Sequence, residues 1–293
     1  DGFKKGFKGN WGADANTKRI GLVQDLNRLS WFTHISHLRK ISLPLDPTSK
    51  VVGPHLLHSS QWGIIDPVDT PDGGNIGLHK HLSIACHITS GFSGYPLIKW
   101  LRANTPLRLL QECTTKYLSS KTKVLVNGNW IGVVVEPIET MDTLKFLRRN
   151  GIIPVYTSIT FEYAQNKLYI YTDGGRLTRP IYYIHNHKPS YDRAEMVDKL
   201  NSGHANWTNL ITGFHKKDDE YFDIKQNKLY DLKELYGEKK IDLEKDSAMI
   251  DYLDTSEEES SLIAIYPEDL KKNKLYTHIE IHPSLLLGVM GNM

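Results

Sequence analysis

Apolar residues in the first part of the chain recur at the spacing of a helix. Steps of three and four separate them within two stretches: Leu22, Leu26, Leu29, Ile35 and Leu38. This period gathers side chains on one helical face, so we expect two short helices, the first over residues 21–29. Arg39 and Lys40 would lie in the last turn of the second helix, where cations suit the helix dipole. Pro44 and Pro47 would end the helical region.

The middle of the chain changes to strand patterns. Residues 81–91 form an apolar run that we expect to be a buried strand, and residues 95–113 are expected to form a helix. Two apolar runs within residues 122–137 flank Asn127-Gly128. Because Asn-Gly is the strongest short signal for a hairpin, we expect two antiparallel strands at this point.

Capping residues and alternation indicate the next elements. Residues 140–150 are expected to form a helix with Thr140 as its cap and Gly151 as its stop. Residues 157–184 predict two alternating strands around a polar turn, then a Gly-Gly turn and a further strand. From residue 189 the chain becomes rich in lysine, aspartate, glutamate and asparagine, and strand patterns return after residue 260.

The order of these elements predicts an α+β fold in several domains, with mixed helices and small, mostly antiparallel, barrel-like sheets. Changes of composition divide the chain into residues 1–86, 87–188, 189–272 and 273–293. The last part opens a new apolar core and then stops. Because the chain also begins without methionine, we expect a fragment of a longer protein.

Composition argues against several classes of protein. The 293 residues are 40% hydrophobic and 24% charged, as in an ordinary globular chain, and the net charge of +2 gives no electrostatic preference at whole-chain level. A nucleic-acid role would therefore need a local basic face. Two cysteines far apart in sequence favour a reducing compartment over a disulfide scaffold. No apolar run approaches the ~20 residues that span a membrane, so we expect no membrane partner.

Acidic residues recur every third position in the turn-rich segment 59–83, at Asp66, Asp69 and Asp72. Calcium loops place ligands on every second residue and end in a glutamate, so this spacing argues against calcium, and nothing indicates magnesium. Two interpretations remain, a polar turn without a function and a rigid shelf beside phosphate chemistry. Pro67 and the nearby glycines would stiffen and turn the backbone of such a shelf.

Other polar clusters favour structural roles. Histidines occur in pairs without the partners that a zinc site needs: His34 and His37, His55 and His58, His79 and His81, and His185 and His187. Gly174 and Gly175 precede Arg176 and Arg179 between predicted strands, so we expect a hairpin turn with two structural arginines rather than a phosphate cradle. The acidic run 257–259 is expected to be a solvated surface.

The first forty residues combine basic and aromatic side chains. Eight basic residues gather there among few acids: Lys4, Lys5, Lys8, Lys18, Arg19, Arg28, Arg39 and Lys40. Phe3, Phe7 and Trp11 are interleaved with them. The combination suits phosphates and stacked bases, and it suits a solvated loop equally well, so composition does not choose between the two.

Motifs in collinear order over nearly the whole chain resemble the central part of the second-largest, β-type subunit of multisubunit DNA-directed RNA polymerases. They read GNWGADANTKRIGLVQDLNRLSWFTHISHLRKISLP, HLLHSSQWGIIDPVDTPDGGNIGL, LVNGNWIGV, FLRRNGII with YTDGGRLTRPI, YLDTSEEESSLIAIYPEDL and YTHIEIHPSLLLGV. The mix of motifs resembles the eukaryotic, polymerase II-like branch and the large-DNA-virus branch most.

The resemblance implies four regions along the chain. They are a fork domain (1–86), a first external domain (87–188), a second external domain (189–272) and the first strand of a truncated hybrid-binding domain (273–293). The shelf would be a wall of the active centre close to the RNA 3′ end, made of Asp69, Thr70, Pro71, Asp72 and Gly73. Asp69 and Asp72 stand where the family carries glutamates, and Asp66 stands where it carries a cysteine.

The resemblance also implies residues that face nucleic acid. Those facing RNA would be Gln24, Asn27, Arg28, His37, Arg39 and Lys40. Those in a fork loop near downstream DNA would be Asp14, Asn16, Lys18 and Arg19, with phosphate contacts from the last two. In bacteria the RNA-facing segment binds rifamycin inhibitors, but this chain departs from it at Asn27 and Leu38, so inhibitor sensitivity does not carry over.

The function implied is a part in transcription by a nucleotidyltransferase, with no catalysis by the fragment alone. No cofactor would be bound by the fragment, since magnesium in the intact enzyme would be held mainly by the largest subunit. Partners would be the largest and smaller subunits, template DNA, nascent RNA and nucleoside triphosphates. The location would be the nucleus of a cell, or the virus factory or virion of a large DNA virus. The alternatives are a free-standing nucleic-acid-binding or structural module, and a divalent-ion enzyme built on Asp66, Asp69 and Asp72.

Overall fold

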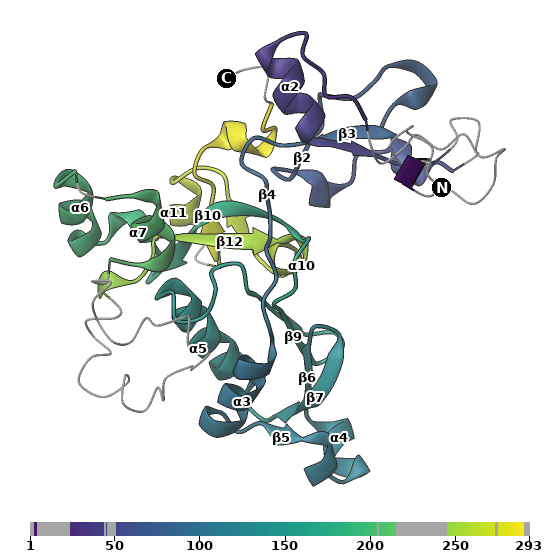
Figure 1. Cartoon of the computed structure of the whole chain (residues 1–293). Helices are drawn as coiled ribbons and strands as arrows, with labels where there is room; N and C mark the ends of the chain where they lie inside the picture. The colour runs from purple at the N-terminus through teal and green to yellow at the C-terminus, as the bar shows by residue number, and fades with distance from the viewer. Residues whose placement is uncertain are drawn as a thin grey trace. The chain divides into compact units, whose positions relative to one another are not determined.

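The computed structural model describes residues 3–4, 24–43, 45, 51–203, 205–214, 245–272 and 275–289. The chain forms two compact units, unit 1 made of Asp1–Ile84 with Ser284–Met293, and unit 2 made of Ala85–Pro283. Helices and small sheets occur in both units, which confirms the α+β class and the expectation of several domains (Figure 1). Within the described residues no sheet closes into a barrel.

Unit 1 is built on a three-stranded antiparallel sheet in the order β1-β3-β2. The strands are β1 (Lys40–Ser42), β2 (Ile65–Asp66) and β3 (His79–Leu82), and the short 3₁₀ helices are η1 (Gly53–His55), η2 (Ser59–Gln61) and η3 (Gly73–Asn75). α2 (Trp31–Leu38) precedes β1 and starts at Ser30, which forms a capping box with Thr33. The end of the chain returns to this unit, where the Gly63 N–H donates to Leu286 O at 2.7 Å.

The helix predicted over residues 21–29 is wrong where the structure describes it, because residues 24–28 are irregular. Asn27 holds them in that form. Its Oδ1 accepts a hydrogen bond from Leu29 N–H at 2.9 Å, and its own N–H donates to His37 Nδ1 at 3.1 Å. Such local bonds compete with helix formation. Lys40 was also misplaced, since α2 ends at Leu38 and Lys40 already pairs with β3.

Unit 2 contains a five-stranded sheet in the order β5-β7-β6-β9-β8. The strands are β5 (Arg108–Leu109), β6 (Thr122–Val126), β7 (Asn129–Val134), β8 (Ser158–Glu162) and β9 (Lys167–Tyr171). All pairs are antiparallel except β6 with β9. α3 (Tyr95–Asn104) and α5 (Pro137–Arg149) pack their apolar side chains against one face. The core there includes Leu97, Trp100, Leu101, Leu144, Leu147, Val124, Val126, Ile159, Leu168 and Ile170.

The hairpin predicted at Asn127-Gly128 is confirmed by β6 and β7. The two residues have positive φ angles of 50° and 81°, as a two-residue hairpin turn of this kind requires. The Asn127 side chain is also used: Nδ2 donates to Thr172 Oγ1 at 2.8 Å, and Oδ1 accepts from Thr172 N–H at 2.7 Å. The turn is therefore fixed both by its backbone and by a neighbouring segment.

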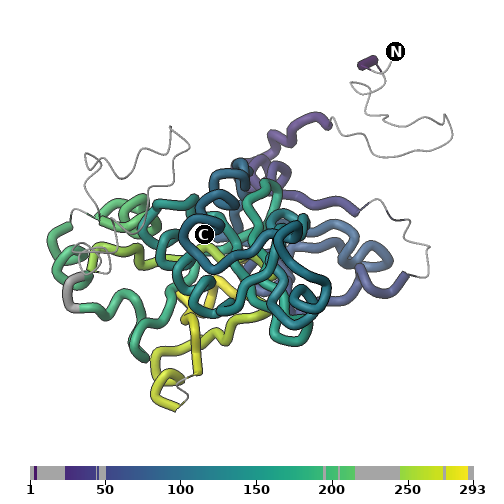
Figure 2. The backbone as a smooth tube through the Cα atoms, turned by 90° about the horizontal axis from the view of Figure 1, so that it is seen from below, coloured from purple at the N-terminus to yellow at the C-terminus, as the bar shows by residue number. Residues whose placement is uncertain are grey.

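The second sheet of unit 2 has six strands around the long strand β10 (Leu177–His185). The others are β4 (His87–Ile88), β11 (Lys188–Pro189), β12 (Ile250–Asp254), β13 (Ile263–Ala264) and β14 (His278–Ile279). Thr178 of β10 pairs with His87 on one edge and with Asp254 on the other. Segments far apart in sequence thus lie side by side, as the teal and yellow-green parts of the tube show (Figure 2).

The remaining helices are short and mostly surround these sheets. They are α4 (Thr115–Ser120), α6 (Ala194–Asn201), α7 (Trp207–Thr212), α10 (Thr255–Glu259), α11 (Asp269–Lys272), η4 (Leu110–Glu112), η5 (Ser190–Asp192) and η8 (Pro283–Leu286). The boundaries predicted at residues 86, 188 and 272 stay predictions. β12 and β14 nevertheless pair with β10, so residues on both sides of position 188 build one sheet.

Three further predicted elements need correction. Residues 81–91 do not form one strand, since β3 and β4 are separated by a turn. The helix expected over 95–113 ends at Asn104, because Pro106 disfavours helical backbone at the residue before it. α5 starts at Pro137 rather than at Thr140, which lies inside the helix and donates to Glu136 O at 2.9 Å. Gly151 ends that helix with a φ of 68°, as predicted.

The segment with Gly174 and Gly175 is not a hairpin turn, because β9 and β10 belong to different sheets. The two arginines after it are structural, as predicted. Arg176 donates to Asp254 Oδ2 at 2.9 Å, and Arg179 donates to Glu280 at 2.7 Å. Both arginines tie β10 to acids from the last third of the chain.

The prediction that the acidic run 257–259 is a solvated surface holds for Glu259, which is exposed, but is wrong for Glu257 and Glu258. Glu257 is fully buried and accepts two hydrogen bonds from Arg148, at 2.7 and 3.0 Å. Glu258 is paired with Arg179 at 2.7 Å. We call the ion pairs that Arg148, Arg149, Arg176 and Arg179 make with acids after residue 250 the arginine–acid network. It joins α5, β10 and the residue before β10 to β12, α10 and Glu280, which directly follows β14.

Candidate functional site

The acidic residues of the predicted shelf lie in a bend, residues 66–73, that leaves β2 and is folded back onto β3. Asp66 is buried, and its Oδ1 accepts hydrogen bonds from the N–H groups of Val68 at 2.9 Å and Asp69 at 3.3 Å. Pro67 restricts the backbone between them. Asp66 therefore closes its own turn, and one of its oxygens is already used by backbone amides.

Thr70 fastens the bend to β3. Its hydroxyl donates to His79 O at 3.0 Å and accepts from the Gly77 N–H at 2.9 Å. Gly77 has a φ of 78°, and a Cβ atom there would come within 2.4 Å of Pro54 O. The position thus requires glycine both for its backbone angle and for its close approach to η1.

His81 holds Asp69. The His81 Nδ1 atom lies 2.9 Å from the Asp69 carbonyl oxygen and 3.3 Å from Asp69 Oδ1. Both oxygens are acceptors, so Nδ1 carries the proton. The His81 side chain is 9% exposed whereas that of Asp69 is 44% exposed. The buried His81 therefore fixes the bend by hydrogen bonds, while the Asp69 carboxylate stays exposed to solvent.

The central strand β3 connects the bend to the basic segment after α2. His81 pairs with Lys40 of β1 on one side and with Asp66 of β2 on the other. Residues that face each other across neighbouring strands point to the same side of a sheet. Lys40, His81 and Asp66 thus share one face, with Asp69 bound to His81.

Two of the predicted site residues have distinct settings. Arg39 donates through Nη2 to Ser83 O at 2.5 Å, so its guanidinium binds the backbone of this unit. Asp72 is exposed and precedes η3, and its side chain makes no capping hydrogen bond to that helix. Of the acids in the bend, Asp69 and Asp72 are thus the ones that present a carboxylate to solvent.

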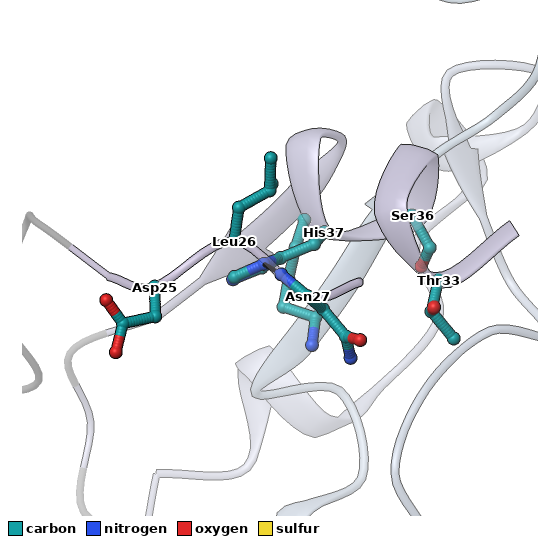
Figure 3. A pocket seen from close by; sticks show the side chains of 7 residues that line it. Asp25, Leu26, Asn27, Thr33, Ser36 and His37 are labelled. Carbon is teal, nitrogen blue, oxygen red and sulfur yellow. Dashed lines mark hydrogen bonds between the residues drawn. The ribbon is translucent and has the colours of Figure 1, made fainter. Parts of the chain in front are cut away.

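A shallow pocket of about 450 Å³ lies between α2 and the segment before it (Figure 3). Its lining consists of Asp25, Leu26, Asn27, Thr33, Ser36, His37 and Lys40. Three of the residues predicted to face RNA, namely Asn27, His37 and Lys40, are among them. Leu26 is the one apolar residue of this lining, and Lys40 is its one lysine.

Hydrogen bonds set the ring of His37 in this pocket. Its Nδ1 accepts from the Asn27 N–H at 3.1 Å, and its Nε2 lies 3.0 Å from Gln24 Oε1. Because Nδ1 is an acceptor, the proton sits on Nε2 and is donated to Gln24. Gln24, also predicted to face RNA, therefore belongs to the same cluster. Arg28 is exposed beside it in sequence but does not line the pocket.

Some of the other predicted features lie within the described residues and some do not. Asp14, Asn16, Lys18 and Arg19, the predicted fork loop, lie outside the described residues. Within the described ranges no three histidine, cysteine or acidic side chains converge in a way that could hold a metal ion. No helix in the same ranges is long and apolar enough to cross a membrane. The acids of the bend are used singly, by amides, by a histidine or by solvent.

Sequence reasoning missed His81 as a residue that holds the bend, and it named Thr70 only as part of the wall, without its hydrogen bonds to β3 and Gly77. The only signal for His81 was its pairing with His79 in a strand, which says nothing of a contact with Asp69. That contact depends on how far the bend folds back over β3. Thr70 carried no separate signal, since a hydroxyl in a turn-rich segment most often bonds to its own turn.

Three family models match the chain. They are described as RNA polymerase Rpb2 domain 3 over residues 24–88, domain 4 over residues 124–185 and domain 5 over residues 242–283. The acidic bend, the sheet of unit 1 and the pocket all fall within the first match. The other two matches fall within unit 2.

Relatives with similarity along the whole chain carry consistent names. The chain is 32% identical over 294 residues to DNA-directed RNA polymerase II subunit RPB2 of Encephalitozoon cuniculi and 31% identical over 298 residues to DNA-directed RNA polymerase II subunit 2 of Arabidopsis thaliana. It is 26% identical over 317 residues to DNA-directed RNA polymerase subunit 2 of Acanthamoeba polyphaga mimivirus. Each match covers 97% of this chain but only 22% or 23% of the relative, so the chain spans less than a quarter of their length.

Proposed function

We propose that this chain, which belongs to the Rpb2 family of second-largest subunits of DNA-directed RNA polymerase, forms part of the wall of an active centre during transcription. The bend with Asp69, Thr70, Pro71, Asp72 and Gly73 borders the RNA 3′ end and the incoming nucleotide. The pocket with Asn27, His37 and Lys40 faces the RNA. Unit 2 serves mainly as scaffold and assembly surface.

The observation that supports this role is the small sheet of unit 1. Its central strand β3 holds the Asp69 bend through His81 and pairs with the strand that begins at Lys40. One short strand thus positions an acidic residue, Asp69, through a side-chain contact and a basic residue, Lys40, through backbone pairing. Charges on a rigid element suit the positioning of phosphates and of the groups that bind them.

Asp69 acts through charge and position rather than as a metal ligand. Its carboxylate contacts His81, and Asp66 is closed on its own turn, so the bend offers no set of converging oxygens that would hold magnesium. The metal ions of the intact enzyme are held mainly by the largest subunit. The nucleotidyl transfer itself therefore needs that subunit, and the bend shapes the space in which it occurs.

The remaining partners follow from the same proposal. The chain assembles with the largest subunit and with smaller ones, and the enzyme uses template DNA, nascent RNA and nucleoside triphosphates. Asp14, Asn16, Lys18 and Arg19 belong to a fork loop at the downstream DNA, where Lys18 and Arg19 contact phosphates. Replacing both by alanine weakens the hold on downstream DNA and lowers its salt dependence. The enzyme works in a nucleus, or in the virus factory or virion of a large DNA virus.

Replacement of Asp69 tests the wall. In a polymerase assembled with the subunit that carries this chain, Asp69→Ala is expected to slow single-nucleotide addition by on the order of 10- to 100-fold while assembly stays normal. Asp69→Asn, which keeps the side-chain shape, separates loss of charge from loss of packing. Asp192→Ala, an exposed acid of unit 2, is the matched control and should change neither property.

The result that would overturn the proposal is clear. If Asp69→Ala and Asp69→Asn both add nucleotides at the rate of the unchanged enzyme, in complexes of normal composition, the bend does not border the reaction.

A further inference from the structure

The five-stranded sheet of unit 2 has one face covered by helices and another that displays a different set of residues. Along β9 the apolar Leu168 and Ile170 are buried in the core with α3 and α5, whereas Lys167, Tyr169 and Tyr171 alternate with them and are partly exposed. In Figure 1 these two helices lie on one side of β6, β7 and β9. We call the opposite side, which carries Lys167 and Tyr169, the outer face.

Strand register arranges cations on the outer face in a row across the sheet. Lys123 of β6 pairs with Lys167 of β9 on one side and with Val133 of β7 on the other. Val133 in turn pairs with Arg108 of β5, and Lys167 pairs with Glu162 of β8. Neighbouring strands are about 4.8 Å apart, so three cations and one acid span the sheet in a single line.

A second row, two residues further along the strands, has an aromatic residue on each side of Leu125. Leu125 of β6 pairs with Trp130 of β7 and with Tyr169 of β9. The rings of Tyr169 and Tyr171 are stacked, with an angle of 6° between their planes. Trp130 donates through Nε1 to Gly132 O at 2.7 Å, so its indole ring is held in one orientation. This row lies about 7 Å from the cations, since two strand residues rise that far.

The two lysines of the outer face, Lys123 and Lys167, lie over aromatic rings. Lys123 Nζ lies 5.2 Å from the centre of the Trp130 ring, and Lys167 Nζ lies 5.9 Å from that of Tyr169. Neither lysine forms an ion pair with an acid in the part of the chain that the structure describes. Lys167 Nζ also donates a hydrogen bond to Gln165 Oε1. Cation–π contacts at exposed sites are weak, so the Lys123 ammonium group is available to an anion, and that of Lys167 can exchange its bond to a neutral amide for one to an anion.

We propose that the outer face binds single-stranded nucleic acid. The phosphates would follow the row of Arg108, Lys123 and Lys167, and the bases would stack on the rings of Trp130 and Tyr169 after the lysines move off them. A strand of nucleic acid carries charges along one edge and flat rings along the other, which matches two parallel rows of cations and aromatics. An acidic peptide matches the cation row but has no regular need for the second row. This contact lies in unit 2 and is separate from the wall of the active centre.

The test uses the chain itself with a fluorescein-labelled oligouridylate of about 16 nucleotides, followed by anisotropy over a series of salt concentrations. Replacing Lys123 and Lys167 together by glutamine should weaken binding about ten-fold at about 50 mM salt. The slope of log K against log salt should fall by about 0.7 for each lost phosphate contact, hence about 1.4. Trp130→Leu should weaken binding about five-fold or more with an unchanged slope, because a lost stacking contact releases no ions.

The matched control is Lys99→Gln with Lys188→Gln, which removes the same charge. Lys99 also lies over a ring, that of Tyr95 on α3, but on a helix that covers the other side of the sheet. Lys188 is exposed in β11. This variant should bind as the unchanged chain does. Circular dichroism melting of all variants establishes that the substituted surface residues leave the fold intact.

Several results would overturn the proposal. One is an unchanged affinity and salt slope for the Lys123 and Lys167 variant, and another is an equal loss in the control. A third is that Arg28→Gln with Lys40→Gln in unit 1 abolishes all binding, because the oligonucleotide would then sit on unit 1. A fourth is that an oligoglutamate peptide displaces the oligouridylate at equal concentration, which would make an acidic protein segment the ligand. Activity of the assembled polymerase enters none of these measurements, so failure of the wall would leave them unaffected.

Discussion

The buried pair of Arg148 and Glu257 offers a sharp test of what holds unit 2 together. Arg148 donates to both carboxylate oxygens of Glu257, at 2.7 and 3.0 Å, and neither side chain is more than 2% exposed. Glu257→Gln keeps the shape of the side chain but removes its charge. The guanidinium then stays buried with Asp251, at 3.4 Å, as its ion-pair partner among the described residues.

The expected loss follows from burial. Removing one partner of a buried ion pair costs about 3–5 kcal/mol, because the other charge stays desolvated. An exposed pair contributes about 0–1 kcal/mol. We therefore expect the free energy of unfolding of unit 2 to fall by about 3–5 kcal/mol in Glu257→Gln, out of about 5–15 kcal/mol for a typical domain. The matched control is Glu112→Gln, whose pair with Arg102 is 56% and 44% exposed.

Urea unfolding followed by tryptophan fluorescence measures both variants, since Trp100 lies in the core of unit 2. A double variant, Arg148→Met with Glu257→Leu, removes both charges and should be less destabilised than Glu257→Gln alone. If Glu257→Gln loses less than about 1 kcal/mol, like the exposed control, the arginine–acid network does not stabilise unit 2 in the way that its burial indicates.

The same pair gives a pH dependence with a definite sign. Burial alone would raise the pKa of Glu257, but Arg148 and Lys145 outweigh it and hold the pKa below its usual value. Arg149 and Arg148 likewise overcome burial and hold the pKa of Asp251 well below its usual value. Their stabilisation is therefore fully present above the unfolded pKa values of about 4, and it is lost as pH falls through the folded ones. Glu257→Gln should flatten this acid limb.

Three further predictions concern single residues. Burial lowers the pKa of His278, and Asp251 offsets this effect only in part, so unit 2 should lose stability as pH falls below about 6.5. In urea unfolding, His278→Gln should lose less stability between about pH 7 and 5 than the unchanged chain does. An equal loss in both would show that His278 does not cause this pH dependence. In the assembled polymerase, His81→Leu should slow nucleotide addition as Asp69→Ala does, whereas His81→Asn, which retains an N–H donor, should keep most of the rate. Equal defects in the two variants would argue against the hydrogen bond from His81 to Asp69 as the contact that positions the bend. Gly77→Ala should destabilise unit 1 by on the order of 2 kcal/mol in urea unfolding because of its positive φ and the contact with Pro54 O, while Gly74→Ala, with open space around it, is the neutral control.

Elements with a strong local signal could be predicted from the sequence. The hairpin at Asn127-Gly128 and the strands β8 and β9 depend on residues that are close in sequence, and these predictions are confirmed. The resemblance to the polymerase family is confirmed as well by the three domain matches. The resemblance rests on many short motifs in collinear order, so a chance match at any one motif could not change the family that they indicate together.

Burial of charges could not be predicted in this way. The run 257–259 has the composition of a solvated surface, and nothing near it in sequence provides a counter-ion. Its partner Arg148 lies more than a hundred residues earlier, on α5, and meets Glu257 where α5 and α10 both pack against β8. The local sequence therefore shows three similar acids, although in the fold Glu257 and Glu258 are paired with arginines and Glu259 is exposed.

The candidate site was predicted in part for a related reason. The spacing of Asp66, Asp69 and Asp72 together with the prolines suggested a rigid acidic bend, and the structure contains one. The different use of the acids could not be foreseen. Asp66 is turned inward because β2 ends there, and Asp69 meets His81 because of the register between β2 and β3. Both depend on strand pairing that the local pattern does not specify.

The two units hold their charges by opposite means, and this has a consequence for mutants. In unit 2 arginines and acids are buried together, so a change of charge there leaves an unpaired ion and acts on stability. In unit 1 the carboxylates of Asp69 and Asp72 and the side chain of Lys40 reach the surface. The bend that carries the two acids is held by amide hydrogen bonds to the buried Asp66 and by the hydrogen bonds of Thr70 and His81. Replacing an exposed charge in unit 1 should therefore alter function with little effect on folding. Charge variants in unit 1 should thus reduce nucleotide addition, whereas charge variants in unit 2 should reduce stability. A stability loss from Asp69→Asn as large as that from Glu257→Gln would contradict this division.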